Sequence, residues 1–162
     1  MKSGVISGWL CGMCAAITLA LGLVCGCSGT GFDFGENTFV AYLADGSVAT
    51  SRKRGVKPLL DALDGGAGRY AKAKCHDRVV GRAAAFIYAR LGVSEVHAPV
   101  MAKGAAAILE LHGIRAHFDD EVPEIRNRAG DGPCPMEHSV RDIADDDVDA
   151  AIAAIRAVFA SR

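Results

Sequence analysis

The sequence predicts a single α/β domain in which helices cover both faces of a mixed sheet of about four to five strands, a three-layer α-β-α arrangement. Three observations predict it. Strand-like and helix-like segments alternate along the chain. An Asp-Gly turn joins the first two strands as an antiparallel hairpin. The later strand–helix–strand units have short connections, which imply parallel strands and right-handed crossovers.

The domain is predicted to begin with the hairpin. Segment 38–44, TFVAYLA, is rich in strand-forming residues, the turn falls at 45–46, and 47–51 returns as the second strand. A short helix is expected over 56–63. Pro58 lies in its first turn, where a missing N–H costs nothing.

Two longer helices and two more strands follow in the middle of the chain. Asp77 is the expected N-cap of the first helix, whose apolar residues recur at helical spacing until Gly92 ends it. Strands are expected over 94–100 and 114–118, separated by a helix over 102–112.

The C-terminal part is predicted to hold two helices. After an irregular acidic stretch at 119–124, a loop rich in Gly and Pro at 127–135 leads into a short helix from Met136. Three aspartates at 145–147 then open the last helix. Its apolar stripe has helical spacing: Val148, Ile152, Ile155 and Phe159.

An apolar segment, residues 1–32, precedes this domain, residues 33–162. It holds no charged side chain after Lys2, and its length would allow a helix to cross a bilayer. A secretory signal, a membrane anchor and an over-extended translation start all stay open. Membrane contact is expected only through residues 4–27, so an anchored or exported form depends on this segment being genuine.

The composition of the chain limits the classes of partner that the domain is expected to bind. The net charge of −1 gives no general attraction to nucleic acid, and an aromatic content of 6% offers few surfaces for stacking bases. We therefore expect no nucleic-acid partner and a small-molecule ligand instead, with a homodimer as an open expectation. The domain has only two cysteines, Cys75 and Cys134, which make no disulfide framework and favour a cytoplasmic location.

The stretch GPCPMEH, residues 132–138, raises the question of a zinc half-site of the deaminase type. Such a site needs three nitrogen or sulfur ligands and a nearby Glu. The start of the helix after the third strand, 101–104, offers no ligand, and Glu137 alone is a hard ligand better suited to Mg²⁺ or to proton transfer. The sequence predicts no metal and no cofactor, with a zinc-dependent deaminase of altered ligands kept as an alternative.

Cys134 is the candidate nucleophile or proton donor. It precedes Pro135 at the start of a short helix, where the dipole stabilises a thiolate. Asp77 or Glu137 would serve as general acid or base. The competing interpretations are structural: Cys134 as a small buried side chain and Asp77 as a helix cap.

Several polar residues fall at strand or helix ends, where ligands bind in open α/β sheets. Lysine and arginine near helix N-termini would suit a small anion. The candidate ligand-binding residues found in this way are Ser51, Gly55, Lys57, Asn127 and Arg128.

From about Asn37 to the last helix, the chain resembles the uncharacterised domain-of-unknown-function family 1893. The resemblance rests on four ordered blocks: SRKRGVKPLLDAL, HDRVVGRAAAFIYARLGV, VHAPVMAKGAAAILELHGI and VPEIRNRAGDGPCPMEHSV. It implies a cytidine-deaminase-like fold without the zinc ligands and no assigned reaction. It also implies that Gly81 and the basic residue after it, Arg82, belong to the candidate site.

Two functions stay open at this point. The first is a domain that binds or acts on a small anionic or nucleotide-like metabolite, by thiol or acid–base chemistry of the hydrolase or transferase kind if it is an enzyme. The second is a non-catalytic interaction or regulatory module on the same scaffold. Chemistry is favoured if Asp77 and Cys134 face one cavity, and largely dismissed if they lie on opposite faces.

Overall fold

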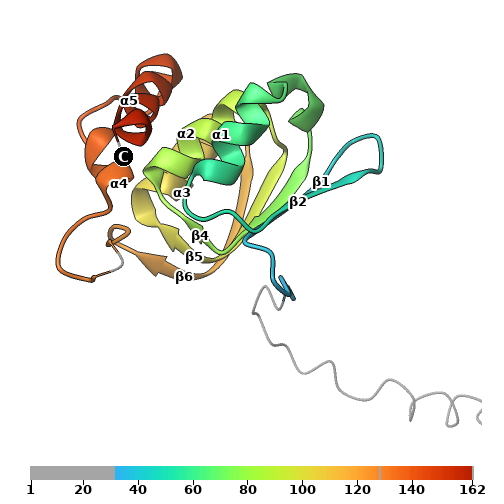
Figure 1. The fold of residues 1–162 in the computed structure, drawn as a ribbon, viewed down its shortest axis with the longest axis horizontal. Coiled ribbons are helices and arrows are strands. Elements are labelled where there is room, and N and C mark those ends of the chain that lie inside the picture. The colour runs from blue at the N-terminus through green and yellow to red at the C-terminus, as the bar shows by residue number, and fades with distance from the viewer. Residues whose placement is uncertain (1–31, 128, 162) are drawn as a thin grey trace, which may run out of the picture.

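The protein, seen in a computed structural model, is described over residues 32–127 and 129–161 (Figure 1). It contains one mixed sheet of six strands and five α-helices within these residues. The strands are β1 (Phe39–Tyr42), β2 (Val48–Ser51), β3 (Lys74–Asp77), β4 (Val79–Val80), β5 (Glu95–Ala102) and β6 (Arg115–Val122). The helices are α1 (Lys57–Asp64), α2 (Arg82–Leu91), α3 (Lys103–Leu111), α4 (Pro135–Ser139) and α5 (Val148–Ala160), with a 3₁₀ turn, η1, at Ala67–Tyr70.

The sheet combines the antiparallel hairpin with parallel strands. β1 pairs antiparallel with both β2 and β3, whereas β5 pairs parallel with β3, β4 and β6. Lys74 pairs with Glu95 and Val79 with Val100, so both β3 and β4 keep the same offset of 21 residues from β5. They are therefore two parts of one strand interrupted at Arg78, and the sheet runs β2–β1–β3/β4–β5–β6.

β3 corrects the sequence prediction. Asp77 was expected to cap a helix, but it ends a strand, and α2 begins only at Arg82 with Gly81 as its N-cap. The pattern misled because this strand is buried on one side only: Cys75 is fully buried, whereas its neighbour His76 is partly exposed. A polar four-residue segment of this kind has no strand signature of its own.

The prediction of helices on both faces of the sheet is not met by the described residues. α1 and α3 flank α2 on one face, and α5 packs against α2 from outside (Figure 1). The core lies between these helices and the sheet, with Phe86, Ile87 and Tyr88 of α2 fully buried. The opposite face, which carries His76, His97 and other polar side chains, has no helix over it among residues 32–127 and 129–161.

The remaining elements follow the prediction closely. The hairpin, α1 with Pro58 in its first turn, and α3 lie where expected. Asp147 caps α5, because its Oδ1 accepts a hydrogen bond from the Ala150 N–H at 3.0 Å. The acidic stretch expected to be irregular instead extends β6 to Val122.

The apolar segment expected to contact a membrane, residues 4–27, lies outside the described residues. Among the helices that the structure describes, none is both long enough and apolar enough to span a bilayer.

Candidate functional site

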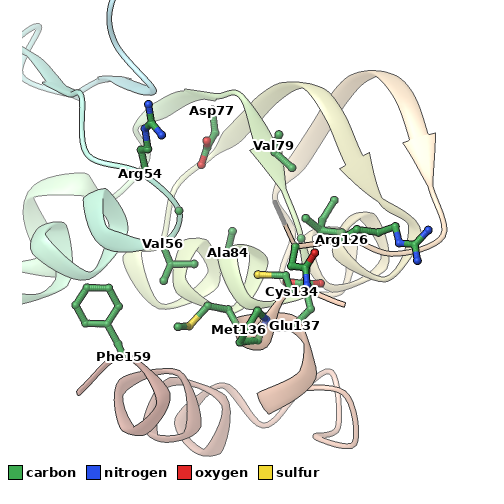
Figure 2. A pocket seen from close by; sticks show the side chains of 15 residues that line it. Arg54, Val56, Asp77, Val79, Ala84, Arg126, Cys134, Met136, Glu137 and Phe159 are labelled. Carbon is green, nitrogen blue, oxygen red and sulfur yellow. The ribbon is translucent and has the colours of Figure 1, made fainter. Parts of the chain in front are cut away.

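A cavity of about 520 Å³ opens where the interrupted strand β3/β4 ends and α2 begins (Figure 2). α4, α5 and the chain just before α1 complete its wall. This volume is in the range of small-molecule sites, which are mostly apolar with a few polar groups. The lining residues are Arg54, Gly55, Val56, Asp77, Val79, Gly81, Ala84, Ile125, Arg126, Asn127, Cys134, Pro135, Met136, Glu137 and Phe159.

Asp77 places a carboxyl group in this cavity. The end of β3 holds it, and the Tyr88 hydroxyl of α2 donates a hydrogen bond to its Oδ2 at 2.9 Å. Burial raises the pKa of Asp77 to about 6, although hydrogen bonds from Tyr88 and from the backbone of Val79 and Arg78 oppose the shift. A carboxyl with this pKa can both release and accept a proton near neutral pH.

Cys134 faces the same cavity as Asp77. Figure 2 shows its sulfur and the Asp77 carboxyl directed toward a common space from two different elements. The Cys134 N–H donates to the Ile125 carbonyl at 3.0 Å, which fixes the start of α4 against the preceding chain. The thiol is free and partly exposed, so it is available to a ligand.

Glu137 has a structural partner within the cavity wall. Its carboxylate accepts hydrogen bonds from the backbone N–H groups of Arg82 at 2.9 Å and Ala83 at 3.0 Å, the first residues of α2. Burial raises its pKa, while these two bonds and the Arg82 charge work in the opposite direction. Glu137 therefore occupies the helix N-terminus at which an anionic ligand was expected.

Gly81 makes this arrangement possible. A Cβ at position 81 would overlap the carboxylate of Glu137, at a separation below any van der Waals contact. The backbone of Gly81 is extended, so its role here is close approach and not an unusual conformation.

Two arginines and an apolar wall complete the cavity. Arg54 and Arg126 lie at its rim on opposite sides, as Figure 2 shows. Val56 and Phe159 form part of the apolar surface. The sequence prediction did not assign Arg126 or Phe159 to the cavity, because tertiary contacts between distant segments have no local sequence signal.

The structure divides the predicted site residues into two groups. Gly55 and Asn127 line the cavity together with Asp77, Gly81, Cys134 and Glu137. Ser51, Lys57 and Arg82 do not line it. Arg128 lies outside the described residues.

The three predicted ligand-binding residues outside the cavity have partners within the chain. The Ser51 hydroxyl accepts a hydrogen bond from the Lys53 N–H at 3.2 Å. Lys57 forms an ion pair with Asp61. Arg82 donates to Asp145 at 2.7 Å and to backbone carbonyls that precede α5, so its side chain points away from the cavity. These three residues therefore interact with other groups of the chain, and not with the anionic ligand that the sequence predicted for them.

Comparison with known proteins identifies the family. The family model described as a domain of unknown function (DUF1893) matches residues 31–159, and the chain belongs to this family. The crystal structure of a DUF1893 family protein (TM1506) from Thermotoga maritima is similar to this chain, with 25% sequence identity and a TM-score of 0.64. The similarity covers 78% of this chain and 81% of that one. No curated protein matches.

Proposed function

We propose that the cavity binds a small anionic, nucleotide-like metabolite and that Asp77 and Cys134 act on it. One observation carries the proposal: an acid with a pKa near neutrality and a free thiol line one cavity whose rim holds Arg54 and Arg126. The apolar wall would hold a flat or hydrophobic moiety, and the guanidinium groups would pair with its anionic group.

In the enzymatic form, Asp77 accepts the proton of the Cys134 thiol, and the sulfur forms a bond to an electrophilic carbon or phosphorus of the ligand. The bond from that atom to its leaving group breaks, and Asp77 returns the proton to the leaving group. This division of roles follows from the chemistry of the groups, since a thiolate is the stronger nucleophile and a carboxyl near its pKa exchanges protons readily. Glu137 positions α2 and the cavity wall, because its two oxygens are engaged by the backbone of that helix.

A non-catalytic module is the second candidate, and the state of Glu137 favours it. A carboxylate held by two N–H groups is no longer free for catalysis, which leaves the cavity with fewer reactive groups than the sequence suggested. A zinc deaminase is less well supported, because its site needs three thiolate or imidazole ligands and Cys134 is the only thiol or imidazole among the described lining residues.

We infer a cytidine-deaminase-like fold for this chain. The support is the element order, in which a hairpin leads into parallel strands joined by helical crossovers. Superposition of the sheet and its crossover helices on a solved cytidine deaminase tests the inference. A different strand order or crossover direction in that protein would contradict it.

The function is tested by ligand binding to the full chain. We would screen anionic metabolites, including nucleoside mono- and diphosphates, by thermal shift, and measure the Cys134 alkylation rate with and without each hit. A ligand of this site should slow alkylation of Cys134. Arg54→Gln and Arg126→Gln should each weaken binding about tenfold, as expected for a lost charge-assisted contact.

Matched variants separate the two candidates. Arg52→Gln removes an exposed arginine that pairs with Glu36 away from the cavity, and it should leave binding unchanged. Cys134→Ser should keep binding and abolish turnover in an enzyme, whereas a binding module turns over nothing in either form. Equal loss of binding in Arg52→Gln and Arg54→Gln would show that general charge, and not the cavity, attracts the ligand.

A further inference from the structure

Three histidines form a row across the open face of the sheet, away from the cavity. His76 of β3, His97 of β5 and His117 of β6 occupy paired positions in the parallel ladders. Their rings stack, with centroids 4.7 Å apart between His76 and His97 and 4.4 Å apart between His97 and His117. Paired positions on adjacent strands direct side chains to the same face, so the sheet itself produces this alignment.

Glu95 brings a carboxylate to the same face, two residues before His97. Its Oε1 lies 2.5 Å from Nε2 of His97 and 3.4 Å from Nε2 of His117. The Glu95 side chain is only 10% exposed, which is unusual for a glutamate. One carboxylate oxygen and two imidazole nitrogens thus lie within 4.8 Å of one another.

The other oxygen of Glu95 is held by cations. Arg115 donates to Oε2 at 2.7 Å, and Lys74 lies 3.6 Å from it. These cations orient the carboxylate, so that Oε1 is directed at the histidines.

His97 and His117 both present Nε2 to the same oxygen of Glu95, and imidazole nitrogen is a common ligand of transition-metal ions.

We propose that Glu95, His97 and His117 form a binding site for a divalent transition-metal ion, with zinc as the best-matched candidate. Two imidazole nitrogens and one carboxylate oxygen are a recurrent zinc ligand set that leaves a fourth position open. A tetrahedral ion with bonds of about 2.0–2.1 Å separates its ligand atoms by about 3.3 Å. The Glu95–His117 pair already has this spacing.

Binding requires a small adjustment of the rings. Two imidazoles stacked face to face cannot both direct an in-plane lone pair at one ion, so one ring must turn. His117 can do so, because its side chain is 47% exposed and lies on an edge strand. The pair formed by His97 and Glu95 must also separate slightly to admit the ion, which replaces the proton between them.

The test is a titration of the full chain with Co²⁺, followed by displacement with Zn²⁺. The proposed site should bind one equivalent of Co²⁺ and give visible d–d bands without the near-ultraviolet charge-transfer bands of cobalt–thiolate bonds. This readout matters because four cysteines, Cys11, Cys14, Cys25 and Cys27, lie in the N-terminal segment and could bind cobalt as thiolates. Long-range ¹H–¹⁵N spectra should show shifts at the His97 and His117 rings.

Single-residue variants decide the assignment. His117→Gln changes an exposed ring and should keep the fold while weakening Co²⁺ binding at least about tenfold. His97→Ala should have the same effect. His138→Ala, which removes an exposed histidine of α4, should bind Co²⁺ as the wild type does. Equal binding by His117→Gln and the wild type, or d–d bands that His97→Ala leaves unchanged, would overturn the proposal.

Discussion

The contact between Gly81 and Glu137 shows how one residue determines the start of a helix. The first N–H groups of a helix lack partners within it, and the usual solution is a side chain at the N-cap itself. Here the N-cap is a glycine, and a carboxylate 56 positions later in the chain supplies the acceptor. The cap of α2 is therefore a tertiary contact.

Gly81→Ala should destabilise the fold by about 1–3 kcal/mol, because the new methyl group displaces the Glu137 carboxylate from two N–H donors. Urea unfolding of the variant and the wild type measures the difference. Gly68→Ala is the matched control, since a Cβ there meets open space. Similar unfolding free energies for the two variants would show that the close approach at 81 contributes nothing.

Asp77 should make the stability of the protein depend on pH. Its pKa is about 6 in the folded state and near 3.8 when unfolded, so the folded protein keeps this proton to a higher pH. Between about pH 4 and pH 6 the folded state binds more protons, and the free energy of unfolding therefore falls as pH rises, by at most about 3 kcal/mol.

This dependence is measured by urea unfolding from pH 3.5 to 7 in the wild type and in Asp77→Asn. The variant cannot ionise at this position, so the difference between the two curves should change across pH 4–6. Asp142→Asn, which alters an exposed aspartate, should follow the wild type. A wild type and an Asp77→Asn variant that run parallel through this range would contradict the raised pKa.

At the scale of elements, Arg82 connects α2 to the chain between α4 and α5. Its guanidinium donates to the Asp145 carboxylate at 2.7 Å and to the Ile143 carbonyl at 2.9 Å. The side chain is mostly buried, with 22% exposure. This contact explains why a basic residue follows Gly81 without requiring a ligand.

Arg82→Ala should cost about 2–4 kcal/mol of unfolding free energy, because it leaves partly buried acceptors without their donor. Thermal and urea unfolding measure this loss. Arg90→Ala provides the comparison within the same helix. Its partner, Asp149, is exposed, and such surface pairs contribute at most about 1 kcal/mol. An Arg82→Ala variant as stable as Arg90→Ala would refute the structural role.

Local sequence signals predicted those elements whose pattern matches their burial. The hairpin, α3 and α5 have clear turn, helix or cap signals, and the structure confirms them. β3 was missed because its four residues, KCHD, are buried on only one side and precede a helical pattern. β6 was ended too early because an exposed edge strand tolerates acidic residues.

The candidate site was only partly predictable for a similar reason. Asp77 and Cys134 were chosen because each was expected at the start of a helix, and both line the same cavity in the structure. No local signal assigned Arg126 or Phe159 to the cavity, and the histidine row can be recognised only once the register of three strands is known. Whether the site binds or reacts stays a prediction.

At the scale of the whole molecule, β5 is the central strand of the sheet and is expected to be its most stable part. It is hydrogen-bonded along both edges, to β3/β4 and to β6, and Val96 and Met101 within it are fully buried. β2 is an edge strand with partly exposed residues, and α4 has only five residues. The stability of the structure should therefore be unevenly distributed.

Hydrogen exchange should be slowest in β5 and α2 and fastest in β2 and residues 129–133. The expected order follows from burial and from the number of paired edges. Mass spectrometry of peptides after timed exposure to D₂O measures it, with β1 as an intermediate reference. Peptides of β2 that exchange as slowly as those of β5 would contradict this order.

The close approach of the Glu137 carboxylate to Gly81 should have constrained how the family evolved. A larger residue at 81 fits only if position 137 carries a shorter side chain than glutamate. The residue tolerated at each of the two positions therefore depends on the residue at the other. Aligned family members should therefore show paired changes, with glutamate at 137 accompanied by glycine at 81. Substitutions that reach one of these positions alone should be removed by selection.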